Sequence, residues 1–327
     1  MLFDRRRLLA AATTSLLIPT LTQAQAPAGW RPTRPIRVIV PFTAGGPTDL
    51  LARMLSEPAG AALGQPLVVE NRTGAGGAIG ADIVAKAAPD GHTILIHDSA
   101  HAVAPALVAR LPFHPVTDFA GISVLVFAPL VLSVNPRVPA QNMNELLTQI
   151  RANPGRFNLA TSGIGGPVHI AGEIFRTAAN AQIEMVHYRG GAPAAAAVIG
   201  GEAQMTILSI AASLEFIRAG SLRPIALTVR ERHRLIPDVP TTAEAGLPGF
   251  RFENWRAAFA PAATPPAAVA ALSAAMQAGL RQIEPRLREL AEQPRPGFDT
   301  SPAVMEFVRR EMEYYTGVLR AAGVRPE

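Results

Sequence analysis

A short apolar run, a turn rich in glycine and then a helical pattern follow one another repeatedly along this chain. The clearest example is Val-Pro-Phe-Thr-Ala-Gly-Gly-Pro at 40–47, which leads into apolar residues at helical spacing. Related turns occur at 161–167 and 188–193. Alternating strands and helices are typical of α/β proteins with largely parallel sheets. The pattern therefore predicts an α/β fold with these turns at the carboxyl ends of strands.

The chain is long enough for two packed lobes, since 327 residues exceed the usual size of one α/β domain. A long apolar run at 121–134 can cross from one lobe to the other, and a return crossing is expected at 222–229. These crossings place lobe one at residues 27–125 with 231–327, and lobe two at residues 126–230.

Short apolar runs predict the individual strands, and the C-terminal segment 303–322 has the spacing of a helix. An alanine-rich run at 257–280 contains three prolines and is a poor candidate for a membrane span. The expected strands are 36–40, 67–69, 93–96, 157–160, 185–187, 205–208 and 225–229.

The N-terminus has the three parts of an export signal. Three arginines at 5–7 precede an apolar stretch at 8–21, and Ala24-Gln25-Ala26 follows as a small-residue cleavage site. The apolar stretch is shorter than the ~20 residues that a spanning helix needs. We therefore expect residues 1–26 to be a signal peptide cleaved near Ala26, and the mature protein to be periplasmic. The arginines fit both the twin-arginine and the general secretory route.

Composition excludes several classes of protein. Residues 27–327 carry 27 basic and 24 acidic side chains without interleaved aromatic residues, which disfavours nucleic-acid binding. The chain has no cysteine, so disulfides and thiolate metal sites are excluded. With 49% hydrophobic and 17% charged residues, a globular protein is expected, and we predict a monomer.

The three glycine-rich turns predict an anion site. Glycine permits a sharp turn, and proline then begins the helix at a position where its missing N–H costs nothing. Exposed N–H groups at such a helix start favour an anion by ~0.3 to 1 kcal/mol, or up to ~2 kcal/mol when partly buried. Glycine and proline can also simply punctuate the turns of an α/β fold. Three such turns, distributed over both expected lobes, favour a binding site between the lobes.

Other motifs in the sequence do not match the patterns of nucleotide-binding, metal or catalytic sites. The glycines at 74–80 have GxGxxxG spacing, which differs from the dinucleotide fingerprint. His97 and His101 lack a third metal ligand nearby, and Ser162 lacks the Gly-x-Ser-x-Gly context of a hydrolase. We therefore expect no catalytic residues, no metal and no cofactor. His169 and His187 also fit structural histidines, and Asp49 also fits a residue that complements the helix dipole.

The chain resembles the tripartite tricarboxylate transporter receptor family, also called Bordetella uptake gene proteins, over essentially the whole mature length. The similar segments occur in the family's order and spacing. They are 41–49 (Pro-Phe-Thr-Ala-Gly-Gly-Pro-Thr-Asp), 70–77, 87–93, 188–192 and 237–246.

The resemblance implies a type II periplasmic binding fold, whose two lobes close on a small organic carboxylate and deliver it to a membrane permease without covalent chemistry. A binding protein that serves a sensor or chemoreceptor is the alternative. The expected ligand-binding residues are Phe42, Thr43, Ala44, Gly45, Gly46, Thr48, Asp49, Ser99, His101, Thr161, Ser162, Gly163, Gly166, His169, Tyr188, Arg189, Gly190, Gly191 and Ser209.

The identity of the acid stays open, but its charge is constrained. Gln204 and Leu208 stand where relatives often carry acids, so an α-ammonium group would lack an acceptor there. Arg189 can hold a second carboxylate bidentately. The sequence therefore predicts a carboxylate without an ammonium group, such as a dicarboxylate or an aromatic acid. The alternative is that Asp49 or Asp98 points into the cleft and supplies the missing acceptor.

Overall fold

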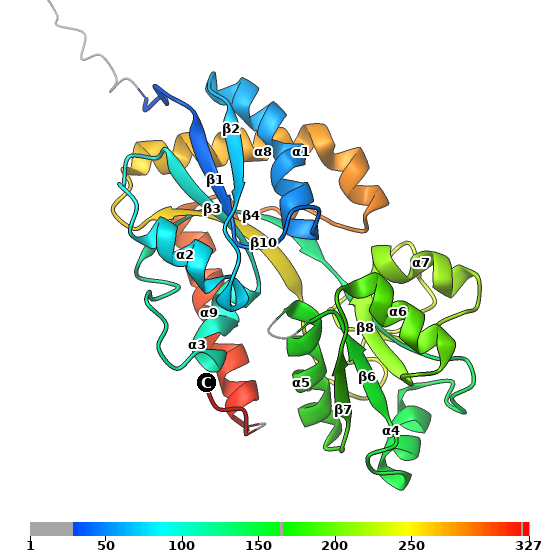
Figure 1. The fold of residues 1–327 in the computed structure, drawn as a ribbon. Coiled ribbons are helices and arrows are strands. Elements are labelled where there is room, and N and C mark those ends of the chain that lie inside the picture. The colour runs from blue at the N-terminus through cyan, green and yellow to red at the C-terminus, as the bar shows by residue number, and fades with distance from the viewer. Residues whose placement is uncertain (1–28, 164–165, 322, 327) are drawn as a thin grey trace, which may run out of the picture.

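The computed structural model describes residues 29–163, 166–321 and 323–326, so the expected signal peptide lies outside the described residues. The chain forms two parts, each built on a five-stranded sheet with flanking helices (Figure 1). Lobe one is built on sheet A, and lobe two on sheet B. The expected α/β fold with two lobes is confirmed. No helix among the described residues is long and apolar enough to cross a membrane.

The two sheets take their strands from different parts of the chain. Sheet A has the order β2-β1-β3-β10-β4, with β1 Ile36–Val40, β2 Leu67–Asn71, β3 Thr93–Asp98, β4 Phe119–Ala128 and β10 Asn254–Pro261. Sheet B has the order β7-β6-β8-β5-β9, with β5 Leu130–Val134, β6 Asn158–Thr161, β7 Glu184–His187, β8 Met205–Ser209 and β9 Arg223–Leu227.

The helices connect and cover these strands. They are α1 Pro47–Leu63, α2 Ala78–Ala85, α3 Ala100–Leu107, α4 Met143–Ala152, α5 Pro167–Ala179, α6 Gly191–Gly200, α7 Ile210–Arg218, α8 Pro266–Glu289 and α9 Ser301–Ala321, with the short 3-10 helix η1 at Ala75–Gly77.

In each sheet four strands share one direction and one strand opposes them. In sheet A the opposed strand is β10, which pairs antiparallel with β3 and β4. In sheet B it is β5, which pairs antiparallel with β8 and β9. The opposed strands are those at which the chain enters each sheet from the other lobe. The mostly parallel sheets that we expected are therefore present, with one antiparallel strand in each.

Of the two crossings between the lobes, the first lies where it was expected and the second does not. Only Pro129 separates β4 from β5, so the apolar run at 121–134 does pass from sheet A to sheet B. The return crossing was misplaced: 222–229 is largely β9, an edge strand of sheet B, and the chain returns through 228–253. The boundaries given above for the two lobes stay a prediction.

The alanine-rich run at 257–280, for which no strand was predicted, is divided between β10 and α8. Ala257, Ala258 and Ala260 are completely buried in β10, which lies between β3 and β4. A strand buried on both faces does not alternate polar and apolar residues. Alanine is also depleted in strands, so this pattern did not indicate one.

Alternate residues of each strand reach the two faces of a sheet and build separate cores. In sheet A, Val38 and Ile94 pack with α1 and α8, whereas Ile39 and Leu95 pack with α2, α3 and α9. In sheet B, Leu159 packs with α4 and α5, whereas Ala160 packs with α6. Helices on both faces leave the strand ends and the turns that follow them for binding.

Candidate functional site

Three helices begin at the carboxyl ends of strands without a capping side chain. They are α1 after β1, α5 after β6 and α6 after β7, with Gly46, Gly166 and Gly190 as their N-cap residues. Both α1 and α5 then start with a proline. Figure 1 shows the starts of α1, α5 and α6 beside the gap between the two lobes. Their first N–H groups are not taken by a capping side chain and form a suitable environment for an anion.

The left-handed conformation in these turns falls on particular glycines. In the turn before α1, Gly45 has a φ of 79°, whereas the N-cap Gly46 has a φ of −71° that any residue can adopt. The turn before α5 has a φ of 128° at Gly163. A side chain would therefore strain the backbone at Gly45 and Gly163. At Gly46 a Cβ would instead lie close to the Thr43 carbonyl oxygen, at 3.2 Å.

Asp49 holds the turn before α1 in place. Its carboxylate accepts hydrogen bonds from the Gly45 N–H at 2.8 Å and from Arg53 and Asn71, each at 2.9 Å. Burial acts to raise the pKa of Asp49, but these hydrogen bonds outweigh it and leave the pKa below its usual range. Asn71 also donates to the Phe42 carbonyl oxygen. The carboxylate is therefore ionised and already bound within lobe one.

The tip of this turn is open to solvent. Thr43, Ala44 and Gly45 are exposed, Phe42 and Gly46 are half-buried, and Thr48 is buried. The exposed tip is backbone and small side chains, so a ligand there would meet mainly peptide groups.

The two turns of lobe two lie next to each other. The Tyr188 N–H donates to the Thr161 carbonyl oxygen at 2.9 Å, and a Cβ on Gly163 would lie 3.9 Å from the Tyr188 carbonyl oxygen. Ser162 is half-buried, and Arg189 is exposed. The structure thus brings together the expected residues of the second and third turns, which are Thr161, Ser162, Gly163, Gly166, His169, Tyr188, Arg189, Gly190 and Gly191.

A histidine that we had not placed in the site belongs to this group. His187 ends β7, and its Nδ1 lies 2.6 Å from the Thr161 hydroxyl oxygen. Its ring meets that of His169 edge to face, with centroids 4.9 Å apart. The signal in the sequence was its position directly before Tyr188, at the end of an expected strand.

Ser99 and His101 are enclosed in lobe one, although both were expected to line the cleft. The Ser99 hydroxyl donates to Asn254 at 3.1 Å, and Ser99 and His101 are both completely buried. The His101 ring stacks on Phe259 and Phe113, and its Nε2 lies 3.0 Å from the Pro115 carbonyl oxygen. Burial, with His97 nearby, lowers the pKa of His101 to about 3. His101 therefore belongs to an aromatic core.

Two further residues of lobe two form hydrogen bonds with the protein backbone. Ser209 caps α7, where its hydroxyl accepts a hydrogen bond from the Ala212 N–H. Gln204 was expected near the ligand, but it precedes β8 at the end opposite Ser209 and binds the backbone of Asn158. Leu208 is nearer the turns, because a Cβ on Gly191 would lie 3.5 Å from its side chain.

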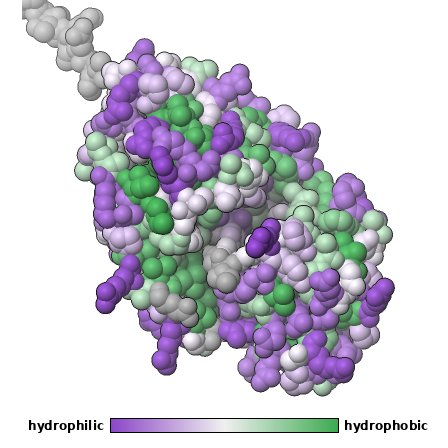
Figure 2. Space-filling model, viewed as in Figure 1, coloured by the Kyte–Doolittle hydropathy of each residue, from purple (hydrophilic) through white to green (hydrophobic). Residues whose placement is uncertain are grey.

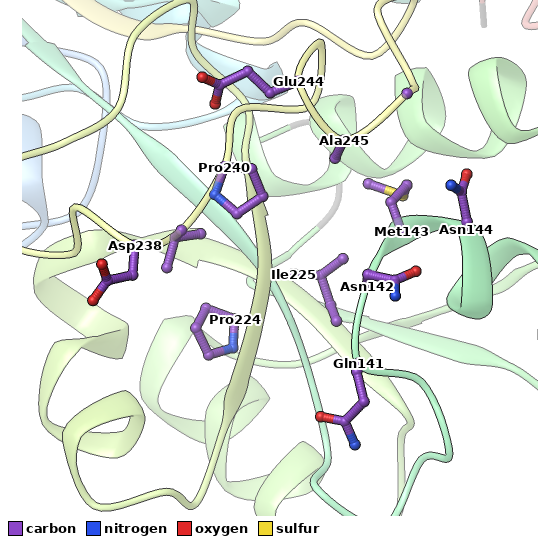
Figure 3. Close-up of a pocket in the computed structure, with 12 residues that line it drawn as sticks. Gln141, Asn142, Met143, Asn144, Pro224, Ile225, Asp238, Pro240, Glu244 and Ala245 are labelled. Atoms are coloured by element: carbon purple, nitrogen blue, oxygen red, sulfur yellow. The ribbon is translucent and has the colours of Figure 1, made fainter.

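Figure 2 shows the surface hollowed between the two lobes. Two pockets lie elsewhere. One, of about 580 Å³, is lined by the start of α4, by β9 and by residues 238–246, with Gln141 and Asp238 at its border (Figure 3). Another, of about 450 Å³, lies between Trp30, the end of α1 and α8. Neither includes a residue of the three turns. No group of three side chains suited to hold a metal occurs within the described part of the chain.

Comparison with known proteins shows the family. The model of the tripartite tricarboxylate transporter family receptor matches residues 51–308. The chain belongs to this family. It is also 36% identical over 296 residues to protein BugT of Bordetella pertussis, covering 90% of this chain and 91% of that protein. The resemblance inferred from the turns is therefore confirmed.

Two solved structures from Rhodopseudomonas palustris are similar to this member of the receptor family. MatC with bound malate is 32% identical, with a TM-score of 0.78 over 88% of this chain and 99% of that chain. A second protein, with adipate, is 32% identical, with a TM-score of 0.79 over 90% of this chain and 99% of that chain. The two similar proteins thus hold small carboxylates.

Proposed function

We propose that this receptor captures a small organic carboxylate between its lobes in the periplasm and delivers it to the membrane permease of a tripartite transporter. The observation that carries the proposal is the set of helix starts at α1, α5 and α6, which belong to both lobes and lack capping side chains. Charge-assisted hydrogen bonds contribute ~1.5 to 3 kcal/mol each, so several suffice for micromolar affinity, about −8 kcal/mol. Binding requires no covalent step.

The charges near the turns favour an acid that lacks an ammonium group. Asp49 is already bound by Arg53, Asn71 and the Gly45 N–H, so it is not free to accept from a ligand. Arg189 is exposed beside the third turn and can bind a second carboxylate. The malate and adipate found in the two similar structures fit this charge pattern.

A thermal-shift screen tests this function. Malate, adipate, succinate, benzoate, aspartate and glutamate are added to the mature protein, and the unfolding temperature is measured. An acid at 100 times its dissociation constant stabilises the folded state by ~2.7 kcal/mol. We expect at least one acid without an ammonium group to raise the unfolding temperature. Stabilisation by none of the six acids would contradict the proposal.

Small-angle scattering tests capture between the lobes. A ligand that contacts both lobes favours the closed population, so the radius of gyration should decrease when the acid identified by the screen is added. An unchanged radius at saturation would show that binding does not involve closure.

A further inference from the structure

Two histidines meet at the start of α5, beside the turns of the proposed site. His169 is the third residue of α5, and His187 ends β7. Their rings are in edge-to-face contact, and Nδ1 of His187 is hydrogen-bonded to the Thr161 hydroxyl. No third ligand completes a metal site with them among the described residues. The two imidazoles can therefore affect ligand binding by gaining or losing a proton.

The surroundings of His169 oppose a positive charge on its imidazole ring. Burial lowers the pKa of His169, and the charges of His187 and Arg176 lower it further, against the opposite effect of Glu173. Nε2 of His169 lies 3.7 Å from Glu173, but Arg176 binds that carboxylate at 2.6 Å. The positive end of the α5 dipole acts in the same direction as burial. His169 is consequently neutral at neutral pH without an anion.

The other elements around α5 add few charges. Strands β6 and β8 pack on α5 and contain no titratable side chain. Helix α9 also packs on α5, but its Glu311 is bound by Arg251 and its Arg309 by glutamates of α9 itself. On the side of β7, Tyr188 and the exposed Arg189 follow His187 directly. A bound carboxylate would thus be the main new negative charge near the pair.

We propose that the His169–His187 pair takes up a proton when a carboxylate binds at the start of α5. This inference rests on the proposed function, since the carboxylate is the captured acid. An anion beside the imidazoles stabilises the charged form of either ring. By linkage, the proton then increases the affinity for the acid as much as the acid increases the affinity for the proton. Binding by this receptor therefore strengthens as pH falls through the range in which histidine titrates.

Calorimetry with malate and adipate tests the coupling. Each acid is titrated into the mature protein at about pH 6.5, in MES and in bis-Tris, which differ in heat of ionisation. We expect the heats in the two buffers to differ by the amount that corresponds to uptake of up to one proton. The dissociation constant should rise between about pH 6 and 8, by at most about tenfold per pH unit for one coupled proton. The second carboxyl of each acid begins to take up a proton of its own at the lower end of this range, so the pH dependence of His169→Gln is the reference.

Histidine variants then show which side chain takes up the proton on binding. His169→Gln and His187→Gln should each reduce the proton uptake, whereas His114→Gln, at an exposed histidine of lobe one, should leave it unchanged. Circular dichroism and the unfolding temperature check that each variant is folded. Equal heats in both buffers with a pH-independent affinity would overturn this inference and leave the proposed function intact. Binding of none of the screened acids at any of these pH values would overturn both.

Discussion

The carboxylate of Asp49 accepts a hydrogen bond from the Gly45 N–H and thereby joins the first helical turn of α1 to the glycine turn that precedes it. Asp49 is buried, and Arg53 and Asn71 also donate hydrogen bonds to its carboxylate. The residue therefore determines the shape of the turn, whose exposed part is the proposed contact with the ligand.

Removing this carboxylate should loosen the turn. We expect Asp49→Ala to lower the free energy of unfolding by about 1 to 3 kcal/mol, because it leaves Asn71 and the Gly45 N–H without their acceptor. The affinity for malate or adipate should fall as well. Urea unfolding and calorimetry measure the two effects. Glu215→Ala, which removes an exposed pair with Arg218, is the control and should change stability by less than about 1 kcal/mol. If the affinity of Asp49→Ala for the acid were unchanged, the shape of this turn would not matter for binding.

A side chain at Gly45 should impair binding more than folding. Gly45 has a positive φ, and a Cβ there would meet no atom within 4 Å. Gly64 at the other end of α1 has a φ of 73° and the same open surroundings, so Gly64→Val is a matched control. Both valine variants should lose about 1 to 2 kcal/mol of stability from backbone strain. Only Gly45→Val should also weaken acid binding, by roughly tenfold or more, and equal affinities in the two variants would contradict this.

Arg189 should distinguish dicarboxylates from monocarboxylates. The guanidinium can form charge-assisted hydrogen bonds worth about 1.5 to 3 kcal/mol, so Arg189→Ala should weaken adipate binding by about tenfold or more and leave benzoate binding nearly unchanged. Arg110→Ala, at another exposed arginine, is the control. Calorimetry measures both acids. Tight aspartate or glutamate binding that persists in Arg189→Ala would show that the site accepts an ammonium group.

His101 should make the fold sensitive to acid. Its pKa is about 3 in the folded chain, below the value near 6.5 of an unfolded histidine. Between these values the unfolded chain binds one more proton, so the free energy of unfolding falls by up to about 1.4 kcal/mol per pH unit as pH decreases. His101→Phe keeps the stacking on Phe113 and Phe259 and should flatten this dependence. Urea unfolding from about pH 7 to 4 should show it, and equal slopes in wild type and variant would exclude His101 as the cause.

The sequence predicted those elements whose local signals agree with their tertiary surroundings. The strands before Gly45 and Gly163 are short apolar runs, and the glycines after them mark the turns, so both could be located. The C-terminal helix was expected at 303–322 and is observed from Ser301 to Ala321. Apolar runs were sufficient for these strands, which are buried on both faces, and helical spacing was sufficient for α9, of which one face is buried.

The remaining features depend on contacts between distant residues. Strand β10 consists partly of alanines that only a central position in sheet A buries. Ser99 bonds with Asn254, and His101 stacks on Phe259, so their burial depends on that same strand, more than 150 positions away. Neither the environment of these side chains nor the contact between His169 and His187 can be inferred from local spacing.

The position of β10 between β3 and β4 also has a consequence for the order in which the chain folds. Sheet B uses strands from a continuous segment, 130–227, and is complete in sequence before residue 254 has been synthesised. Sheet A lacks its connection between β3 and β4 until β10 emerges from the ribosome. Domains generally form as soon as their segments are available, and pairings between distant segments form slowly. Lobe one is therefore the last to become stable during synthesis, although its first strand is made long before any strand of lobe two.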